Sequence, residues 1–381
     1  MPSIEELLGM PTLPAASAAP ARNRPVPNIE FSFLFFSDVR KDVSDREKYD
    51  FMRDITLFGD RAGFTAVYIP ERHFSEFGSI YANSAIMAAH LIPQTKNIRF
   101  RTAGVSLPLH HPAEVVEWWA MNDILSGGRV DLGFGSGWNK ADFIFAPQNY
   151  DNRKQICLDQ IPVIQKLWRG ESVSFRGVDG KDYPITVYPR PQQKELNVWL
   201  LGTSDDTYIA AGKLGYNIFT MLQGISLDGI AKKVKLYREA RSGAGFDADS
   251  GIFSLMLHTF VHPDKDRIIS AVEKPFKEYI KSSLDPHLAA GLEKESAGMR
   301  DGRAITAEEK EKIIDYAFQR YFGTAALFGN VEQASAIVDK AIQAGVNDIA
   351  CLVDFGMDYD TVRDSLPHLQ QLVKRFRPTS A

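Results

Sequence analysis

From Ile29 onward, segments typical of buried β-strands alternate with segments typical of amphipathic helices. Such alternation is the pattern of a parallel sheet whose crossover helices cover it. Eight strands are predicted, and they are Phe31–Phe36, Thr65–Ile69, Ile98–Val105, Val130–Phe134, Val198–Leu201, Asn217–Met221, Phe253–Val261 and Asn347–Leu352. Eight strand-helix units are the number that closes such a sheet on itself, so the sequence predicts a (β/α)8 barrel rather than an open sheet.

Two connections between the predicted strands are longer than a barrel needs. Residues 171–197, after the fourth strand, contain a hairpin-like run with several turn residues. Residues 264–325, after the seventh strand, are charged and rich in helix formers, with Pro275 and Pro286 as predicted helix breaks. We predict that both are insertions, and that the second forms a helical cover over the carboxyl ends of the strands.

Composition excludes several classes of partner. A net charge of −4, with Lys and Arg scattered among acidic residues, provides no basic surface for nucleic acid. No apolar run is long enough to cross a membrane. Cys157 and Cys351 lie far apart and have no metal or redox spacing, which predicts buried thiols in the cytoplasm. Residues 1–28, rich in Pro and Ala, are expected to form a flexible tail, and residues 29–381 one barrel domain.

Ligands of a (β/α)8 barrel bind at the edge where the strands end. Polar or aromatic side chains follow the predicted strands there, namely Ser37, Asp38, Glu71, Arg72, His73, His110, His111, Trp138, Asn139, Thr203, Ser204, His258 and Asp354. One interpretation is a metal-dependent hydrolase in which the four histidines converge with Asp354. However, the end of strand one lacks the paired histidines usual in such barrels, so no metal site is predicted. A second interpretation is a binding protein that has the same pocket and no chemistry.

Glycines cluster in the stretch from Leu125 to Phe143, LSGGRVDLGFGSGWNKADF. Gly133, Gly135 and Gly137 leave no side chain where a ligand would approach the backbone. The spacing differs from the dinucleotide fingerprint, because Lys140 stands where a third glycine should be. The stretch therefore favours a flat cofactor at the exit of strand four, without identifying it.

Four segments, in order and spacing, resemble the bacterial luciferase alpha subunit: PERHFSEFG at 70–78, RTAGVSLPLHHP at 101–112, the glycine stretch at 125–143 and VWLLGTSDDTYIAAGKLG at 198–215. The RHF, SGWN, PRP and MLHTF segments are similar to the luciferase-like branch found in natural-product biosynthesis, beside polyketide and peptide synthetases. This resemblance implies a barrel, reduced FMN as cofactor, and insertion of one oxygen atom from O₂ into an organic substrate.

The same resemblance implies three groups of FMN-binding residues. Thr102, Ala103 and Gly104 would lie against the flavin ring, which the family often places over a non-proline cis peptide. Ser136, Trp138 and Asn139 would wall the ring, and Thr203, Ser204 and Thr207 would hold the phosphate at a helix N-terminus. Two positions depart from luciferase, since Ser136 replaces a phosphate-binding arginine and Thr203 replaces a glutamate. Asp205 and Asp206 would repel a phosphate unless they point away.

The catalytic residues are expected in Glu71-Arg72-His73, where luciferase has Glu-His-His and uses the first histidine. Arg72 stays protonated and cannot serve as a base, but it can stabilise negative charge on the oxygenated cofactor or on a substrate carboxyl or phosphate group. His73 keeps a titratable imidazole and is the predicted acid-base group, with a structural role as the alternative.

No segment carries a nicotinamide fingerprint, which predicts a two-component system served by a separate flavin reductase. A deazaflavin is the alternative cofactor. The resemblance further implies a homodimer formed through the early helices. It also implies a polyketide or peptide intermediate as substrate, free or tethered to a carrier protein, with hydroxylation as the first choice of reaction and Baeyer–Villiger insertion as the second.

Overall fold

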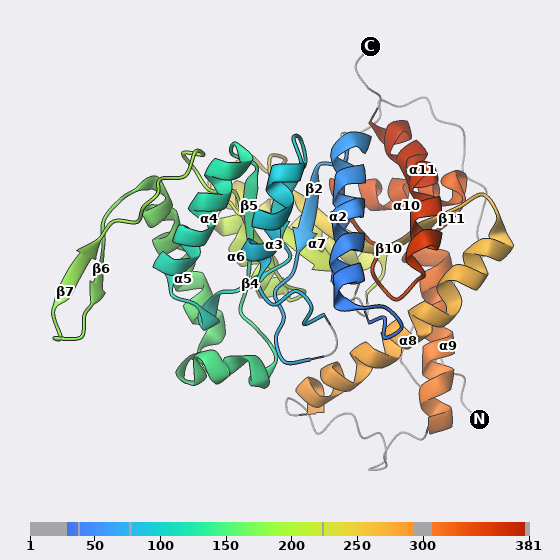
Figure 1. Cartoon of the computed structure of the whole chain (residues 1–381), viewed down its shortest axis with the longest axis horizontal. Coiled ribbons are helices and arrows are strands. Elements are labelled where there is room, and N and C mark those ends of the chain that lie inside the picture. Colours follow the sequence, from blue (N-terminus) through green and yellow to red (C-terminus); the bar gives the residue numbers. More distant parts are fainter. Residues whose placement is uncertain (1–28, 37–38, 76–77, 223–224, 293–306, 378–381) are drawn as a thin grey trace.

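The computed structural model describes residues 29–36, 39–75, 78–222, 225–292 and 307–377, so Ser37, Asp38 and the predicted tail at 1–28 lie outside the described residues. Within them, eight parallel strands form a closed barrel with helices around it (Figure 1). In barrel order the strands are β1 (Glu30–Leu34), β2 (Ala66–Ile69), β3 (Arg99–Thr102), β5 (Val130–Gly135), β8 (Val198–Leu201), β9 (Asn217–Met221), β10 (Phe253–Val261) and β12 (Asp348–Leu352). β12 pairs with β1 and closes the cylinder, which confirms the predicted (β/α)8 barrel.

Outer helices follow the strands along the chain. They are α2 (Asp45–Ala62), α3 (Ser84–Leu91), α4 (Pro112–Ser126), α5 (Arg153–Arg169), α6 (Asp205–Lys213), α7 (Leu227–Gly243), α10 (Val331–Gln343) and α11 (Tyr359–Phe376). In α2 the bounds follow from local sequence, because Ser44 and Glu47 form a reciprocal capping box and Gly63, at φ 86°, ends the helix. Phe51 and Ile55 lie on its fully buried face. The local sequence therefore accounts for both ends of this helix and for its buried face.

The third strand differs from its prediction. β3 ends at Thr102 instead of Val105, because Gly104 adopts φ 108° and turns the chain out of the strand. A separate short strand, β4 (Val105–Ser106), then pairs with the end of β5. This break places residues 102–106 beside the glycine-rich exit of β5, because Val105 lies opposite Phe134 and Ser106 opposite Gly135.

The predicted insertions follow the fourth and seventh barrel strands. After β5 come the short helices η3 (Lys140–Phe145) and η4 (Pro147–Asn149), then α5, and then the antiparallel hairpin of β6 (Val173–Arg176) and β7 (Asp182–Ile185). The hairpin projects away from the barrel at the left of Figure 1. Two further short helices, η1 (Ile92–Gln94) and η2 (Leu107–Leu109), flank the third strand unit.

The second insertion contains α8 (Lys265–Leu292), α9 (Ala307–Thr324) and β11 (Leu327–Gly329), which pairs with β10. The predicted helix breaks at Pro275 and Pro286 are wrong, because α8 continues through both positions. Val272 and Phe276 are buried on either side of Pro275. Packing of this face offsets the hydrogen bond that a proline removes from the helix.

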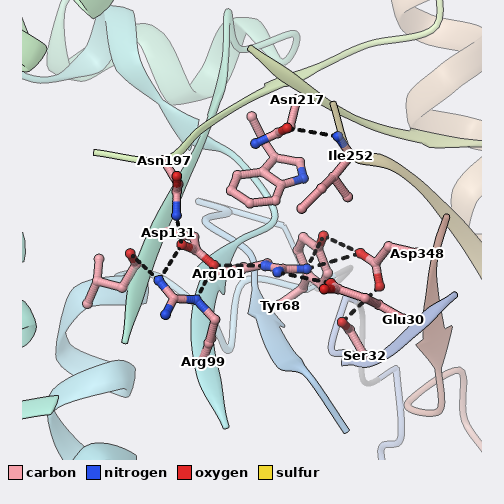
Figure 2. A network of polar contacts seen from close by, with 12 residues as sticks. Glu30, Ser32, Tyr68, Arg99, Arg101, Asp131, Asn197, Asn217, Ile252 and Asp348 are labelled. Carbon is pink, nitrogen blue, oxygen red and sulfur yellow. Dashed lines mark hydrogen bonds and ion pairs between the residues drawn. The ribbon is translucent and has the colours of Figure 1, made fainter. Parts of the chain in front are cut away.

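The amino-terminal half of the barrel interior holds charged residues instead of an apolar plug. Figure 2 shows Arg101 between carboxylates of opposite strands, with its Nε 2.9 Å from Asp131 and its Nη1 3.2 Å from Asp348. Both carboxylates are fully buried, and Tyr68 donates to Asp348 at 2.7 Å. Glu30 contacts the Arg101 Nη2 at 3.2 Å. Glu30 and Asp348 begin their strands and Asp131 is the second residue of β5, so these ion pairs lie towards the end of the barrel opposite the carboxyl edge.

Candidate active site

Two histidines converge on one buried carboxylate at the carboxyl edge of the barrel. Glu71 and His73 follow β2, and His110 ends the turn of η2. Glu71 Oε1 lies 2.8 Å from His110 Nε2 and 3.2 Å from His73 Nε2. All three side chains are almost enclosed, with exposed fractions of 5% for Glu71, 10% for His73 and 14% for His110.

Electrostatics favour a charged pair between Glu71 and His110. Burial would raise the pKa of Glu71, but hydrogen bonds from His110 and then His73 outweigh it and lower that pKa. Burial would lower the pKa of His110, but the hydrogen bond to Glu71 and its charge outweigh it and raise that pKa. The carboxylate therefore stays ionised at neutral pH, and its charge favours the protonated form of His110.

Arg72 brings a permanent positive charge to the same edge. Its guanidinium lies over the Phe36 ring at 4.1 Å, and its backbone N–H donates to Tyr81 O. Burial lowers the pKa of Arg72 to about 10, opposed by the charges of Tyr279, Asp142 and Asp354. Arg72 is still protonated at neutral pH, so it can stabilise an anion and cannot accept a proton.

The loop after β5 adds an acid to this cluster. Asn139 caps η3 by accepting from Ala141 N, and its amide donates to Asp142 at 2.8 Å. Burial raises the pKa of Asp142, while the charges of His73 and Arg72 and the Asn139 bond oppose that rise. Phe145, at the end of η3, packs edge-on against His73 with ring centroids 5.1 Å apart. The η3 segment thus brings the Phe145 ring against His73 and the Asp142 charge near Arg72 and His73, and Trp138 stands partly exposed just before it.

The predicted ring-binding segment is tightly packed. Thr102 donates to Gly133 O at 2.8 Å and accepts from Gly133 N at 2.7 Å, so its hydroxyl is used in joining β3 to β5. A Cβ placed on Gly104 or Gly133 would lie 2.8 Å from the Leu201 side chain, which already covers both glycines. Ala103 is buried. The one cis peptide among the described residues precedes Pro189, so the non-proline cis peptide implied at 102–104 is not found.

Open space begins at Gly135, two residues beyond Gly133 in β5. A Cβ on Gly135 would meet no atom within 4 Å, and Ser136 next to it is only half-buried. Because Phe134 lies opposite Leu200, the exits of β5 and β8 stand side by side. The open backbone at Gly135 therefore lies beside the strand that leads through Leu201 to Gly202.

The helix α6 offers an exposed N-terminus at this place. Ser204 is its N-cap and accepts from Thr207 N, and the Ser204 and Thr207 hydroxyls are 2.9 Å apart. Asp205 forms an ion pair with Lys233 of α7, so its negative charge is already neutralised. Free N–H groups, two hydroxyls and the exposed Thr203 are donors that suit a phosphate.

The histidines do not assemble into a metal site. His111 Nδ1 accepts from Ala113 N at the start of α4, and its ring packs against Phe175. His258 is enclosed by four aromatic rings, and burial lowers its pKa to about 3. Asp354 accepts from Phe36 N and from the Tyr81 hydroxyl. No group of three potential metal ligands occurs in the part of the chain that the structure describes.

Sequence reasoning did not recognise the pairing of Glu71 with His110, or Asp142 as part of the cluster. Glu71 stands beside the predicted catalytic residues, but His110 is 39 positions away. The doubled His110-His111 after strand three was the available signal, and only the fold shows which of the two turns inward.

Among the described helices, none combines the length and apolar character that crossing a bilayer requires.

Comparisons with known proteins agree with this fold. The family model described as luciferase-like monooxygenase matches residues 29–348. The oxygenase component of the flavin-dependent trigonelline monooxygenase of Acinetobacter baylyi is 24% identical over 351 residues, covering 88% of this chain and 92% of that protein.

Two solved structures share the fold. The FMN complex of the oxygenating constituent of 3,6-diketocamphane monooxygenase from Pseudomonas putida has a TM-score of 0.71 and 18% identity, covering 92% of this chain and 98% of that one. An F420-dependent secondary alcohol dehydrogenase has a TM-score of 0.67 and 14% identity, covering 92% of this chain and 99% of that one. The chain belongs to the luciferase-like monooxygenase family, and is a flavin-dependent monooxygenase or oxidoreductase.

Proposed function

We propose that the chain is the oxygenase of a two-component, FMN-dependent monooxygenase that hydroxylates a secondary-metabolite intermediate. The observation that carries this proposal is the partly buried cation Arg72 beside the His73–Glu71–His110 group, at the edge where the exit of β5 leaves open space at Gly135. Reduced FMN, when bound, supplies the electrons that activate O₂. The residues of the chain must then bind the cofactor, stabilise negative charge and move protons.

The FMN phosphate is placed at the N-terminus of α6, with Thr203, Ser204 and Thr207 as its donors. The exposed hydroxyls and the pairing of Asp205 with Lys233 support this position. The ring is placed over Gly135 and against Leu201, with Ser136, Trp138 and Asn139 along its side. Residues 102–104 contribute backbone only, because the Thr102 hydroxyl is occupied and Ala103 is buried.

Arg72 and His73 divide the remaining work. Arg72 stabilises negative charge that develops on oxygen during the reaction, and its burial strengthens that interaction. His73 holds or moves the proton that hydroxylation requires. Glu71, ionised beside His110, orients the His73 ring by accepting from its Nε2.

A separate reductase is proposed because a relative that matches over most of its length is itself named an oxygenase component. A homodimer is proposed because large apolar side chains of α3 and α4 face outward. Ile86 is 68% exposed, and Met121, Ile124 and Leu125 follow one another on the outer face of α4. This face agrees with the implied pairing through the early helices.

The substrate is proposed to enter beneath α8 and α9. These helices bring Phe276, Tyr279 and Tyr321 against His258, close to Arg72 and Asp354. An aromatic roof of this kind suits the apolar body of a polyketide or peptide intermediate, free or tethered to a carrier protein.

The test is reconstitution of the purified chain with FMN, a flavin reductase, NADH and labelled O₂, using candidate carrier-bound and free intermediates. Mass spectrometry is expected to find one labelled oxygen atom in the product, and little NADH oxidation without the reductase. A second candidate, F420-dependent oxidoreduction, is favoured by the similarity to the F420-dependent dehydrogenase. Activity with reduced F420 and none with reduced FMN would select that candidate.

A further inference from the structure

The contact of two imidazoles with the same oxygen of Glu71 restricts where their protons can be. A carboxylate oxygen only accepts hydrogen bonds, so each Nε2 must carry a hydrogen to bond it at 2.8 and 3.2 Å. If His73 is neutral, its lone pair is then on Nδ1. The ionised state of Glu71 thus determines which nitrogen of His73 can accept a proton.

Glu71 would not remain ionised by itself in this position. Its side chain is 5% exposed, and burial of an unpaired carboxylate favours the protonated form. A protonated Glu71 could donate to Nε2 of His73, which would move the hydrogen of a neutral His73 to Nδ1. The closer of the two histidines, His110, provides the donor that opposes this change.

Among the surrounding charged groups, His110 is the one that keeps Glu71 ionised. The carboxylates that act on the two histidines are Glu71 and Glu114 for His110, and Glu71 and Asp142 for His73. Arg72 acts on Asp142, whereas burial and then the two histidines act on the pKa of Glu71. His110 is also fixed in place by its edge-on contact with Trp118, with ring centroids 5.5 Å apart.

We propose that Glu71 and His110 are positioning residues that hold His73 in the Nε2–H tautomer, so that Nδ1 is the atom that accepts the proton. His110 keeps Glu71 ionised, and Glu71 then fixes the ring of His73. The inference rests on the proposed function only for the reaction that uses His73, because the tautomer itself requires neither cofactor nor substrate.

The test is ¹⁵N NMR of histidine-labelled protein without flavin, with His73→Gln used to identify the His73 signals. Across pH 6 to 9, neutral His73 in the unaltered chain is expected to show N–H at Nε2 and a lone pair at Nδ1. In His110→Phe, Glu71 should take up a proton at a much higher pH than before, since buried glutamates reach pKa values of about 8–9. His73 should then show the opposite tautomer at pH 6 and return to Nε2–H towards pH 9.

Matched variants separate this role from a loss of packing. His110→Gln keeps a neutral N–H donor and should retain much of the Nε2–H tautomer, whereas Glu71→Gln should abolish the single tautomer at every pH. His90→Gln, on the exposed side of α3 and remote from Glu71, is the control and should leave the tautomer of His73 unchanged. Circular dichroism establishes that each variant is folded, and Glu71→Gln still tests the proposal if His110→Phe is not.

Catalysis provides the second readout. With FMN and reductase, His110→Phe is expected to lower the ratio of product to hydrogen peroxide about tenfold or more at pH 7, with recovery as the pH rises. An Nδ1–H tautomer in the unaltered chain, or an unchanged tautomer in both His110→Phe and Glu71→Gln, would overturn the proposal. The expected NMR signals without any flavin-dependent turnover would support the positioning role and count against the proposed function alone.

Discussion

At the scale of single residues, Arg72 and His73 are neighbours in the chain with different chemical capacities. The Arg72 guanidinium lies over the Phe36 ring, and it stays protonated at neutral pH. His73 packs against the Phe74 and Phe145 rings and is held by Glu71. Loss of Arg72 should destabilise negative charge that develops on oxygen during the reaction. Loss of His73 should slow proton transfer.

Substitution of either residue should therefore uncouple the enzyme in its own way. His73→Ala is expected to bind FMN normally, to lose product formation by about 100-fold or more, and to release hydrogen peroxide instead. Arg72→Leu should shorten the lifetime of the oxygenated cofactor in rapid-mixing spectra, because the nearby positive charge is gone. Normal coupling in His73→Ala, with only a lower melting temperature, would show that His73 is structural.

Gly78 supports Arg72 through its lack of a side chain. It has φ 82°, and a Cβ there would lie 2.5 Å from both Arg72 Cδ and the Phe36 carbonyl oxygen. Gly63 has a similar φ of 86° but open space around it, so it provides a matched control. We expect Gly63→Ala to cost about 1 kcal/mol of unfolding free energy in urea titrations, and Gly78→Ala about 2–4 kcal/mol. Equal losses would mean that the contact with Arg72 is unimportant.

The sequence predicted Arg72 and His73 because they are adjacent in a recognisable motif. It could not predict the contact between Glu71 and His110, since that contact depends on how η2 turns after the break at Gly104. His110 and His111 look equivalent in the sequence. The backbone directs one towards Glu71 and uses the other as the N-cap of α4.

At the scale of elements, the N-terminus of α6 makes a testable contribution to FMN binding. Ser204 caps α6 and Ser226 caps α7 in the same manner, so alanine at either position should cost about 1 kcal/mol of stability. Only Ser204→Ala should weaken FMN binding, by about tenfold, because a hydrogen bond to a charged group is lost. Titration with riboflavin, which lacks the phosphate, should show no such difference. Equal FMN affinity in both variants would exclude α6 as the phosphate site.

Elements were predictable where local pattern decides them. The eight barrel strands and the cap of α2 follow from hydrophobic runs and a capping motif, which act within a few residues. The continuous α8 was not predictable, because buried contacts of Phe276 and its neighbours maintain it through Pro275. The division of β3 from β4 was missed for a similar reason, as a glycine's left-handed conformation leaves no trace in composition.

At the scale of the whole molecule, the ion network around Arg101 joins strands from opposite sides of the barrel. Arg101→Met should cost about 3–5 kcal/mol of unfolding free energy, because Asp131 and Asp348 would remain buried without their shared cation. Arg363, whose ion pairs with Asp54 and Asp360 are near the surface, is the control, and Arg363→Met should cost under about 1 kcal/mol. Similar losses in the two variants would show that the network contributes no more than a surface ion pair.

The ion network around Arg101 also limits where small molecules can enter the barrel. Salt bridges and hydrogen bonds occupy the barrel at its amino end, so the described residues leave no apolar route to the interior there. We therefore expect a single access route to the active site, beside α8 and α9. Oxygen and substrate would enter by this route, and hydrogen peroxide would leave by it. A bulky substrate bound in that access route would hinder the escape of hydrogen peroxide. We therefore expect the yield of hydrogen peroxide per reducing equivalent to fall as larger substrate analogues are used. Peroxide yields measured across a graded series of analogues would test this expectation.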